Sequence, residues 1–492
     1  MRLILVVLLI IIGRAALHAQ LPYFNRVDTF SGFAKTFGSI YSYDNKVLIT
    51  HAYAKFTPAY NEVTVVHLYD YEGNLILNKK FILDSSISTS RLKFAKSSNN
   101  FLYMGFSIAD LTDTVNDTQN RYYALAKLDD NLDTLWVKYY DRPTIYYEFV
   151  QGITALHDGL LLFGSVRDST INTFNNYHVM KTDFDGNMLW HHTYPETAIA
   201  RHGLYLKAIE LPDRSIRIMG QNYQYYDATF DRLDSMGNKI YHRVYFNDYN
   251  DYPTDMIPCK EGGYVIVGFH DTEHLGLVAD SFRMSIMKMN SVGTLQWKKS
   301  IELGDNVGIN GIVQNDDSTY TISYAYVDYS DGIEEFKTGI RKFDVNFNEL
   351  WDRKIKPISG DHAEALIFHG SQGGYIFAAK DINLDPWICY VDKCGYQTPD
   401  SGCVISAIEE QAQLEASVIL YPNPAATQLT LYWDGTEPAR ISIYNTLGQL
   451  VLTQAITYAN TSFDISRLAT GIYTLQLIDA KGRSAVRKWV KE

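Results

Sequence analysis

Few side chains in this sequence have the types and spacing that chemistry requires. His270 and His274 form an H-x-x-x-H pair, which on a helix places two imidazoles on one face to bind a metal. Here the pair follows an apolar, strand-like run and lies in a loop, so the spacing predicts no metal site. Ser371 lies between glycines but lacks the first glycine of a nucleophile elbow, and we interpret HGSQGG as a hairpin turn.

An acidic segment with Asp183, Asp185 and Asn187 is a second candidate. Alternating oxygen ligands of this kind begin a calcium loop, but the glutamate that completes such a loop is absent downstream. Aspartate and asparagine also form tight turns, which is the simpler interpretation. The sequence therefore predicts no catalytic residue, no metal and no cofactor.

The same acidic segment belongs to a repeat that determines most of the fold. Residues 180–194, MKTDFDGNMLWHHTY, indicate a strand, a tight turn and a second strand, and they are one of seven similar copies. The interval between successive turn residues runs from 48 residues (Asp344 to Asp392) to 59 residues (Asp70 to Asp129). Such intervals are typical of propeller blades rather than helical repeats. The seven turns begin at Asp70, Asp129, Asp183, Asp234, Asn290, Asp344 and Asp392.

Each copy is preceded by another turn and a short apolar run, such as DGLLLFGS at residues 158–165. Four strands per repeat, and no segment with a convincing helical period, predict an all-β, seven-bladed β-propeller over residues 21–400. The seventh copy ends after Gly395, so its blade lacks an outer strand. We expect residues 21–30 to supply that strand and close the ring, which leaves no long unpaired edge. An open solenoid is the alternative.

In five copies an aromatic residue follows the turn residue by seven positions, and we expect it to pack between blades. In the form D-x-x-G-x-x-x-W the motif resembles the blades of pyrroloquinoline-quinone dehydrogenases, where the tryptophan docks between blades. The resemblance implies the type of blade alone, because no adjacent cysteine pair and no quinone or calcium ligands accompany it. The five aromatic residues are Trp136, Trp190, Tyr241, Trp297 and Trp351.

Composition restricts the possible partners. The 492-residue chain is 46% hydrophobic and 20% charged, which is typical of a folded globular protein, and its 37 tyrosines suit half-buried strands. Its formal net charge is -12, and it contains no basic run. Nucleic acids and anionic membranes attract clustered lysine and arginine. We therefore expect neither as a partner.

Residues 1–20 have the pattern of a cleaved signal peptide. Arg2 precedes an apolar run from Leu3 to Ile12, and the segment ends in Ala19-Gln20. The run is too short to cross a bilayer, although a membrane anchor is the alternative. No cysteine follows it to carry a lipid, and no later apolar stretch is long enough to span, so we expect no transmembrane segment after signal cleavage.

Export exposes the four cysteines to oxidation. Cys394 and Cys403 bracket the short loop GYQTPDSG, and we expect them to form a local disulfide. Cys389 lies within an apolar strand and Cys259 before another, so we expect both to be small buried residues. The spacings that a zinc site requires are absent.

Four motifs follow one another in the C-terminal part of the chain. LYPNP occupies residues 420–424, ISIYNTLGQ 441–449, LATGIY 468–473 and RKWVK 487–491. Together they resemble the type A C-terminal sorting domain of the type IX secretion system. The resemblance assigns the sorting signal to Tyr421, Pro422, Asn423, Pro424, Tyr444, Asn445, Gly448, Gly471, Tyr473, Lys488 and Lys491.

This resemblance implies an export route. Such domains direct a folded cargo through an outer-membrane translocon, and a sortase then commonly removes the domain and can attach the cargo to lipopolysaccharide. The expected partners are therefore the translocon and the sortase, and the expected location is extracellular or on the cell surface. Without the family, alternating strands and glycine turns predict a small β-sandwich at residues 417–492, after a linker at 401–416.

Loops that do not repeat are the best guide to a ligand. In a propeller, the links between second and third strands emerge on the same face as the links between blades, and here both are rich in Tyr, Asp and Asn. Hydrogen-bonding rings on a rigid frame predict a glycan- or protein-binding surface, although loop packing is the plainer interpretation. The candidates are Tyr146, Tyr147, Tyr223, Tyr225, Tyr226, Tyr249, Tyr252 and Tyr329.

The sequence thus favours a secreted, non-catalytic binding or adhesion module. An extracellular hydrolase or lyase that acts on polysaccharide or peptide is the first alternative, because propellers host both kinds of function. A structural part of a surface assembly is the second. Two carboxylates, or a His/Tyr/Arg cluster, in one pocket would favour the enzyme.

Overall fold

The structure is a computed structural model. It describes residues 25–27, 34–56, 60–82, 87–89, 92–110, 121–141, 145–168, 170–171, 175–195, 203–222, 227–245, 251–271, 282–302, 308–328, 335–355, 366–369, 373–380, 386–397, 414, 418–433, 439–456, 460–480 and 482–492. The expected signal peptide and nearly all of the expected linker lie outside these residues. Every element named within them is a β-strand, which confirms the all-β prediction.

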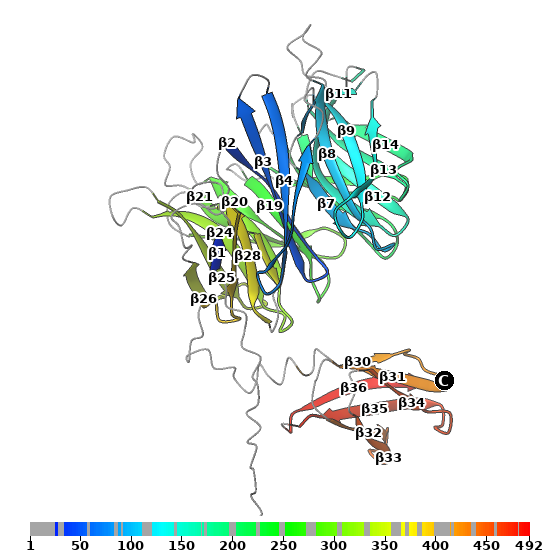
Figure 1. Cartoon of the computed structure of the whole chain (residues 1–492). Coiled ribbons are helices and arrows are strands. Elements are labelled where there is room, and N and C mark those ends of the chain that lie inside the picture. The colour runs from blue at the N-terminus through cyan, green and yellow to red at the C-terminus, as the bar shows by residue number, and fades with distance from the viewer. Residues whose placement is uncertain are drawn as a thin grey trace, which may run out of the picture.

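Most strands belong to consecutive antiparallel sheets (Figure 1). Sheet 1 contains β2 (Ala34–Tyr43), β3 (Lys46–Phe56), β4 (Tyr60–Asp70) and β5 (Leu75–Ile82). Sheet 2 contains β6 (Ile87–Thr89), β7 (Lys93–Lys96), β8 (Leu102–Asp110), β9 (Arg121–Leu128) and β10 (Thr134–Tyr140). Sheet 3 contains β11 (Ile145–Leu156), β12 (Gly159–Asp168), β13 (Asn176–Thr182) and β14 (Met188–Tyr194).

Sheets 4 to 7 repeat the arrangement. Sheet 4 contains β15 (Gly203–Glu210), β16 (Ile216–Asn222), β17 (Ala228–Leu233) and β18 (Lys239–Tyr245). Sheet 5 contains β19 (Asp251–Pro258), β20 (Tyr264–Asp271), β21 (Phe282–Met289) and β22 (Leu295–Ile301). Sheet 6 contains β23 (Gly308–Gln314), β24 (Tyr320–Asp328), β25 (Glu335–Phe343) and β26 (Glu349–Ile355). Sheet 7 contains β27 (Leu366–His369), β28 (Tyr375–Lys380), β29 (Pro386–Val391) and the N-terminal β1 (Asn25–Val27).

The last two strands of each of sheets 1 to 6 form the hairpin that the sequence repeat predicts. In sheet 3 the Oδ1 atom of Asp183 accepts hydrogen bonds from the backbone amides of Asp185 (2.9 Å) and Asn187 (2.7 Å), and Gly186 has a φ of +74°. A glycine adopts this left-handed conformation without steric cost. The same pair of hydrogen bonds forms at Asp70, Asp129, Asp234, Asn290, Asp344 and Asp392.

In five of the six outer strands, β10, β14, β18, β22 and β26, the aromatic residue of the repeat lies against the turn of the next sheet. A Cβ atom on Gly237 would lie 2.6 Å from Cζ3 of Trp190, so the indole covers this turn in van der Waals contact. Trp136 covers Gly186 in the same way, and the hydroxyl of Tyr140 donates to the Gly186 carbonyl at 2.8 Å. These rings are half-buried, because their outer faces remain on the rim of the sheets.

Apolar side chains fill the space between neighbouring sheets. One cluster joins Leu160 and Leu162 of sheet 3 to Tyr123 of sheet 2. Another joins sheet 1 to sheet 7 through buried residues that include Ile49 and Ile376. Sheet 7 also contains β1, whose Asn25 lies opposite Cys389, so residues 25–27 pair with β29.

The C-terminal unit, residues 418–492, consists of two sheets. One contains β30 (Ile419–Tyr421), β31 (Gln428–Tyr432) and β34 (Asn460–Asp464); the other contains β32 (Ala439–Asn445), β33 (Leu450–Ile456), β35 (Gly471–Ile478) and β36 (Ser484–Lys491). Their facing apolar residues form one core with fully buried Leu429, Leu475 and Trp489. This arrangement is the expected small sandwich.

No helix within the described residues is long and apolar enough to cross a membrane.

The contact at Gly237 generates a stability prediction. Gly237→Ala introduces a Cβ at a φ of +82° and within 2.6 Å of the Trp190 ring, whereas Gly262→Ala introduces one at a φ of +92° with no heavy atom within 4 Å. The φ strain is shared and costs about 1–2 kcal/mol. The collision should cost Gly237→Ala roughly 1–3 kcal/mol more in the free energy of unfolding. Urea denaturation of both variants measures the difference, and equal midpoints would mean that the indole does not pack against the turn.

Candidate functional site

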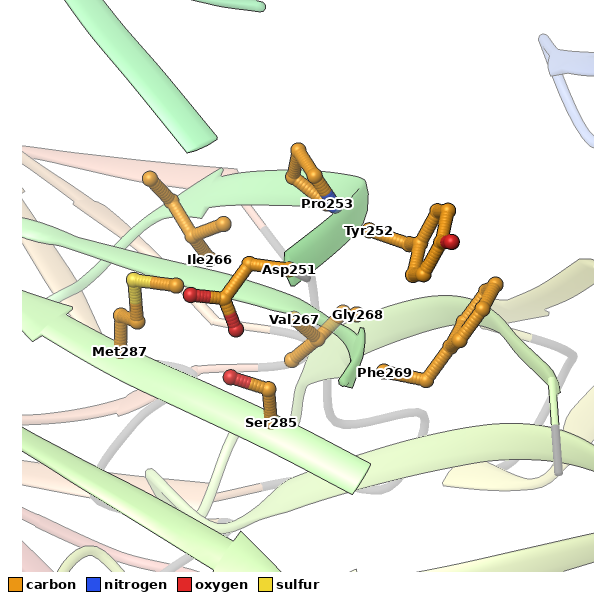
Figure 2. Close-up of a pocket in the computed structure, with 9 residues that line it drawn as sticks. All are labelled: Asp251, Tyr252, Pro253, Ile266, Val267, Gly268, Phe269, Ser285 and Met287. Atoms are coloured by element: carbon orange, nitrogen blue, oxygen red, sulfur yellow. The ribbon is translucent and has the colours of Figure 1, made fainter. Parts of the chain in front are cut away.

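The loop-side end of sheet 5 brings polar and aromatic side chains together around a shallow crevice. The crevice is too narrow to admit a water molecule. Figure 2 shows the carboxylate of Asp251 and the hydroxyl of Ser285 on one side, and the stacked rings of Tyr252 and Phe269 on the other. The crevice is lined by Asp251, Tyr252, Pro253, Ile266, Val267, Gly268, Phe269, Ser285 and Met287.

Asp251 begins the first strand of sheet 5 and is 1% exposed. Both its carboxylate oxygens accept hydrogen bonds from Lys298 Nζ, at 2.7 and 2.9 Å. Burial raises the pKa of Asp251, and the charges of Lys298 and His270 offset only part of that effect. The carboxylate is thus held in a dry ion pair, and it accepts a proton more readily than an exposed aspartate does.

His270 and two serines extend this polar cluster. His270 lies opposite Asp251 in the strand register, and its Nε2 is 2.7 Å from Ser300 Oγ. Ser285 is buried, and its hydroxyl has no hydrogen-bond partner within the described residues. A buried hydroxyl without a partner carries a free-energy cost of about 1–3 kcal/mol. Because the crevice admits no water molecule, these buried groups interact with one another rather than with solvent in this structure.

An aromatic cluster occupies the opposite face of the same strands. Tyr252 stacks on Phe269 with ring centroids 4.7 Å apart, and Phe282 meets Phe269 edge-on at 5.5 Å. Successive residues of a strand point to opposite faces, which explains why Tyr252 and Asp251 are separated although they are adjacent. The three rings are half-buried, so they offer apolar surface together with the Tyr252 hydroxyl.

The candidate ligand-face tyrosines are only partly described. Tyr252 lies at the site above, and Tyr146 occupies the equivalent second position of a first strand, β11, next to Tyr147. The side chains of Tyr146 and Tyr147 lie outside the described part of the structure. So do five whole residues, Tyr223, Tyr225, Tyr226, Tyr249 and Tyr329. His274, Ser371 and Cys403 lie outside them as well. Cys394 is disulfide-bonded, while Cys259 and Cys389 are buried free thiols.

One group of potential metal ligands was missed by the sequence analysis. His157 Nδ1 lies 2.6 Å from Glu210 Oε1 and 3.4 Å from Asp158 Oδ1, so three ligand atoms of the described chain converge. Glu210 Oε2 also accepts the backbone amide of His157 at 2.8 Å. Between sheets 5 and 6, the backbone amide of Lys260 donates to the Gln314 side chain in the same way. The hydrogen bond from His157 to Glu210 therefore joins two neighbouring sheets, 3 and 4. Since 53 residues separate His157 from Glu210, local spacing gave no signal.

A second unexpected cluster surrounds Asp231, which is fully buried in β17. Its carboxylate accepts hydrogen bonds from the Tyr205 hydroxyl (2.5 Å) and His242 Nδ1 (2.6 Å), and Lys239 Nζ lies 3.0 Å away. Burial opposes ionisation, but the His242 hydrogen bond, the Lys239 charge and the Tyr205 hydroxyl outweigh it and lower the pKa of Asp231. Both carboxylate oxygens of Asp231 are engaged by these three side chains. The cluster therefore stabilises the packing of its strands rather than presenting a reactive group.

The lowered pKa of Asp231 gives a pH-dependent prediction. A depressed carboxyl pKa contributes stability above the unfolded value, about 3.9, and loses it as pH falls through the lower folded value. We expect Asp231→Asn to cost roughly 3–5 kcal/mol at pH 7, because it leaves the charge of Lys239 uncompensated and weakens the hydrogen bonds to Tyr205 and His242. The difference from the native protein should shrink below about pH 4.

Chemical denaturation between pH 3 and pH 7 measures this difference. Asp213→Asn is the matched control, since Asp213 also has a lowered pKa but lies in an exposed ion pair with Arg232. Exposed pairs contribute little. A deficit for Asp231→Asn that stays constant over the whole pH range would contradict the ionised, paired state of this carboxylate.

The motif residues of the C-terminal unit lie at a turn, at the end of the edge strand β36 and in the core. Asn445 Oδ1 accepts the amides of Leu447 and Gln449, both at 3.0 Å, so Asn445 forms the same turn as the aspartates of the repeat. Asn423 Oδ1 accepts the amide of Val490 at 2.9 Å, next to Lys491. Tyr473 stacks on Trp489 with centroids 5.1 Å apart. These residues thus form a turn, a contact at the end of β36 and part of the core of the sandwich.

Comparison with known families identifies this unit. Residues 419–492 match the family described as the secretion system C-terminal sorting domain. The tail is a type IX sorting domain. The protein is therefore secreted across the outer membrane, to the cell surface or the extracellular medium. We refer to residues 418–492 below as the sorting domain.

Comparison with solved structures concerns the repeat region. The chain is similar to the β-propeller domain of the Trilobed protease from Pyrococcus furiosus, with 9% identity, 77% of this chain and 99% of that chain covered, and a TM-score of 0.39. It is similar to a PL25 ulvan lyase bound to a sugar fragment, with 9% identity, 78% and 98% coverage and a TM-score of 0.46. A protein of unknown function from Dyadobacter fermentans matches with 12% identity, 63% and 93% coverage and a TM-score of 0.42. No curated protein matches the chain.

The family assignment gives a localisation prediction. Deletion of residues 419–492 removes the sorting domain. Among the described residues, the core of this domain includes no side chain of the repeat region, so the repeat sheets should still fold. Without the domain the protein should accumulate in the periplasm. Cell fractionation with an antibody against the repeat region measures the distribution, and a control deletion of Lys491 and Glu492 shows the effect of the extreme terminus. Normal surface delivery of the long deletion would contradict an export role.

Proposed function

We propose that the repeat region is a seven-bladed β-propeller closed by the N-terminal strand, with quinoprotein-like blades, and that it acts outside the cell as a non-catalytic glycan- or protein-binding module. Within this proposal, residues 21–400 form the propeller, 401–416 the linker and 417–492 the sorting domain. A type IX translocon and a sortase handle the sorting signal, and Cys394 pairs with Cys403. Support for the ring comes from the cluster of Ile49 and Ile376, which joins the first sheet to the last.

One observation carries the binding proposal: the half-buried Tyr252–Phe269 stack lies at the end of sheet 5, on the opposite face of its strands from the buried polar cluster. The stack supplies a flat apolar surface, and the Tyr252 hydroxyl supplies a hydrogen-bonding group at its edge. Rigid aromatic rings contribute contact area at a low cost in conformational entropy. A sugar ring, which has apolar faces and polar edges, matches this combination.

The polar cluster favours binding over catalysis. Among the described residues that line the crevice, Asp251 is the one carboxylate, and both its oxygens are engaged by Lys298. Glycoside hydrolysis requires a pair of carboxylates flanking the scissile bond, and these lining residues do not supply it. The observation that keeps a lyase or hydrolase as the alternative is the proximity of Asp251, with its raised pKa, to His270. An acid and a base at one site are the minimum for proton transfer.

Binding can be tested with residues 21–400 on a glycan array and in quantitative titrations against the best ligand. Tyr252→Ala should weaken binding roughly tenfold or more, as expected for an aromatic hot spot. Tyr252→Phe keeps the ring and should retain most of the affinity, which separates stacking from hydrogen bonding. Tyr139→Ala, at an exposed tyrosine of the outer strand β10, is the control and should bind normally.

The same material decides between the two functions. Incubation with a panel of polysaccharides and peptides should show no turnover. Turnover that disappears in Asp251→Asn or His270→Gln, without any ligand on the array, would refute the binding proposal in favour of the enzyme.

A further inference from the structure

Three potential metal ligands meet where sheets 3 and 4 join. His157 and Asp158 are the two loop residues between β11 and β12, whose ends pair through Leu156 and Gly159. Glu210 is the last residue of β15, the first strand of sheet 4. The ligand atoms, His157 Nδ1 and one oxygen of each carboxylate, all lie within 4.8 Å of one another. In the described part of the chain, no other three His, Cys, Asp or Glu side chains converge in this way.

A second contact holds each carboxylate in place. Glu210 Oε2 accepts the backbone amide of His157 at 2.8 Å, while Glu210 Oε1 faces the His157 ring. Lys181 Nζ donates to Asp158 Oδ2 at 2.9 Å, while Asp158 Oδ1 lies 3.4 Å from His157 Nδ1. The Lys181 side chain is only 6% exposed, so this partner is itself fixed by packing. Each carboxylate therefore uses one oxygen to fix its orientation and directs the other toward the histidine.

The two sheets are packed tightly beneath these side chains. Leu156, Ala208 and Ile216 are buried in the apolar cluster that spans sheets 3 and 4. The hydroxyl of Thr154 donates to the Ala208 carbonyl at 3.0 Å, which adds a polar link across the same joint. The distance between the ligands is therefore set by the packing of the sheets, so an ion would bind to preformed positions rather than order a loop.

The joint between sheets 5 and 6 has the same framework with other side chains. There the backbone amide of Lys260 donates to the Gln314 side chain at 2.8 Å, and Lys288 Nζ lies 2.6 Å from Glu261 Oε1. Lysine and glutamine thus replace the histidine and the glutamate of the other joint. A protonated lysine has no lone pair for a metal, and the Gln314 amide group donates to Glu261 at 2.8 Å. The framework therefore does not require the ligand set that sheets 3 and 4 carry.

The ligand types favour a first-row transition metal. One imidazole with two carboxylates suits Zn²⁺, whereas Ca²⁺ and Mg²⁺ prefer oxygen ligands alone. Bonds of about 2.0–2.2 Å in a tetrahedron place ligand atoms about 3.3 Å apart. The 3.4 Å from His157 to Asp158 matches this spacing, and the 2.6 Å contact to Glu210 must widen by only about 0.7 Å. The His157 and Asp158 side chains are 36% and 44% exposed, so water can reach the remaining position.

We propose that His157, Asp158 and Glu210 bind one Zn²⁺ ion that links sheet 3 to sheet 4, with water as the fourth ligand. The ion takes the place of the hydrogen bond between His157 Nδ1 and Glu210 Oε1. Lys181 and Arg214, whose Nη1 lies 4.0 Å from Glu210 Oε2, offset the two carboxylate charges. With three protein ligands and this charge balance, the ion binds reversibly, unlike the ion of a closed four-ligand site.

Calorimetric titration with ZnCl₂ of the full chain, freed of metal with EDTA, tests the site. We expect one Zn²⁺ per chain and a melting temperature that rises with zinc, because an ion that binds only the folded state stabilises it by mass action. Glu210→Gln and His157→Lys introduce the residue types that the joint of sheets 5 and 6 carries, so both variants should fold. Each should weaken zinc binding at least roughly tenfold, since the loss of a ligand's hydrogen-bonding partner alone costs about 10–100-fold. Neither should melt at a higher temperature when zinc is added.

Asp316→Asn is the matched control. It removes a carboxylate from the joint of sheets 5 and 6, where Asp316 forms an exposed ion pair with Lys260 at 2.9 Å, and it should leave zinc binding unchanged. A native chain that binds no zinc overturns the proposal, and so does native affinity in both ligand variants. Equal weakening by Asp316→Asn would mean diffuse binding to surface carboxylates and would also overturn it. Tighter binding of CaCl₂ than of ZnCl₂ would refute the choice of a transition metal.

The zinc site is separate from the proposed ligand surface. It lies on sheets 3 and 4, and no residue that lines the sheet 5 crevice takes part in it. Zinc binding should therefore be normal in Tyr252→Ala, and ligand binding should be normal in Glu210→Gln. A failure of the binding proposal would leave the zinc result intact, and the reverse also holds.

Discussion

The structure depends on one small interaction, the turn in which a carboxylate accepts two backbone amides. The side chains of Asp183 and its equivalents accept hydrogen bonds from the backbone amides two and four residues ahead. The residue three positions after each of them adopts the left-handed conformation, which lets the chain reverse. A residue without a side chain at Gly237 then leaves space for Trp190 from the preceding sheet. Because the turn is both the end of one hairpin and the contact surface for the next sheet, its geometry sets the spacing between sheets.

This coupling explains why the sequence predicts the scaffold well. The turn needs Asp or Asn at one position, glycine or another residue tolerant of positive φ at a second, and an aromatic four residues after that, and all three requirements are local. Where glycine is absent, Leu132 and Phe347 adopt the same conformation and are buried, so packing replaces conformational ease. Strand pairing and the N-terminal contribution to sheet 7 follow from the repeat.

The polar clusters could not be predicted in the same way. Asp251 and Lys298 are 47 residues apart, and His157 and Glu210 are 53 apart, so each pair exists only because neighbouring strands or sheets are brought into register. Composition gave no sign that Asp231 is buried while its neighbour Arg232 is not. The candidate tyrosines were chosen because they lie in segments that do not repeat. In such segments no recurring turn or strand pattern determines where a side chain points, so the sequence does not predict its contacts.

The pairing of β1 with β29 has a consequence for the order in which the protein is made. Asn25 meets Cys389, 364 residues further along the chain (389 − 25). Contacts between such distant residues close late, since the intervening chain must first be synthesised and ordered. The first strand of the repeat region is therefore the last to find its partner, and its exposed backbone must be kept from other edges until the final sheet has emerged.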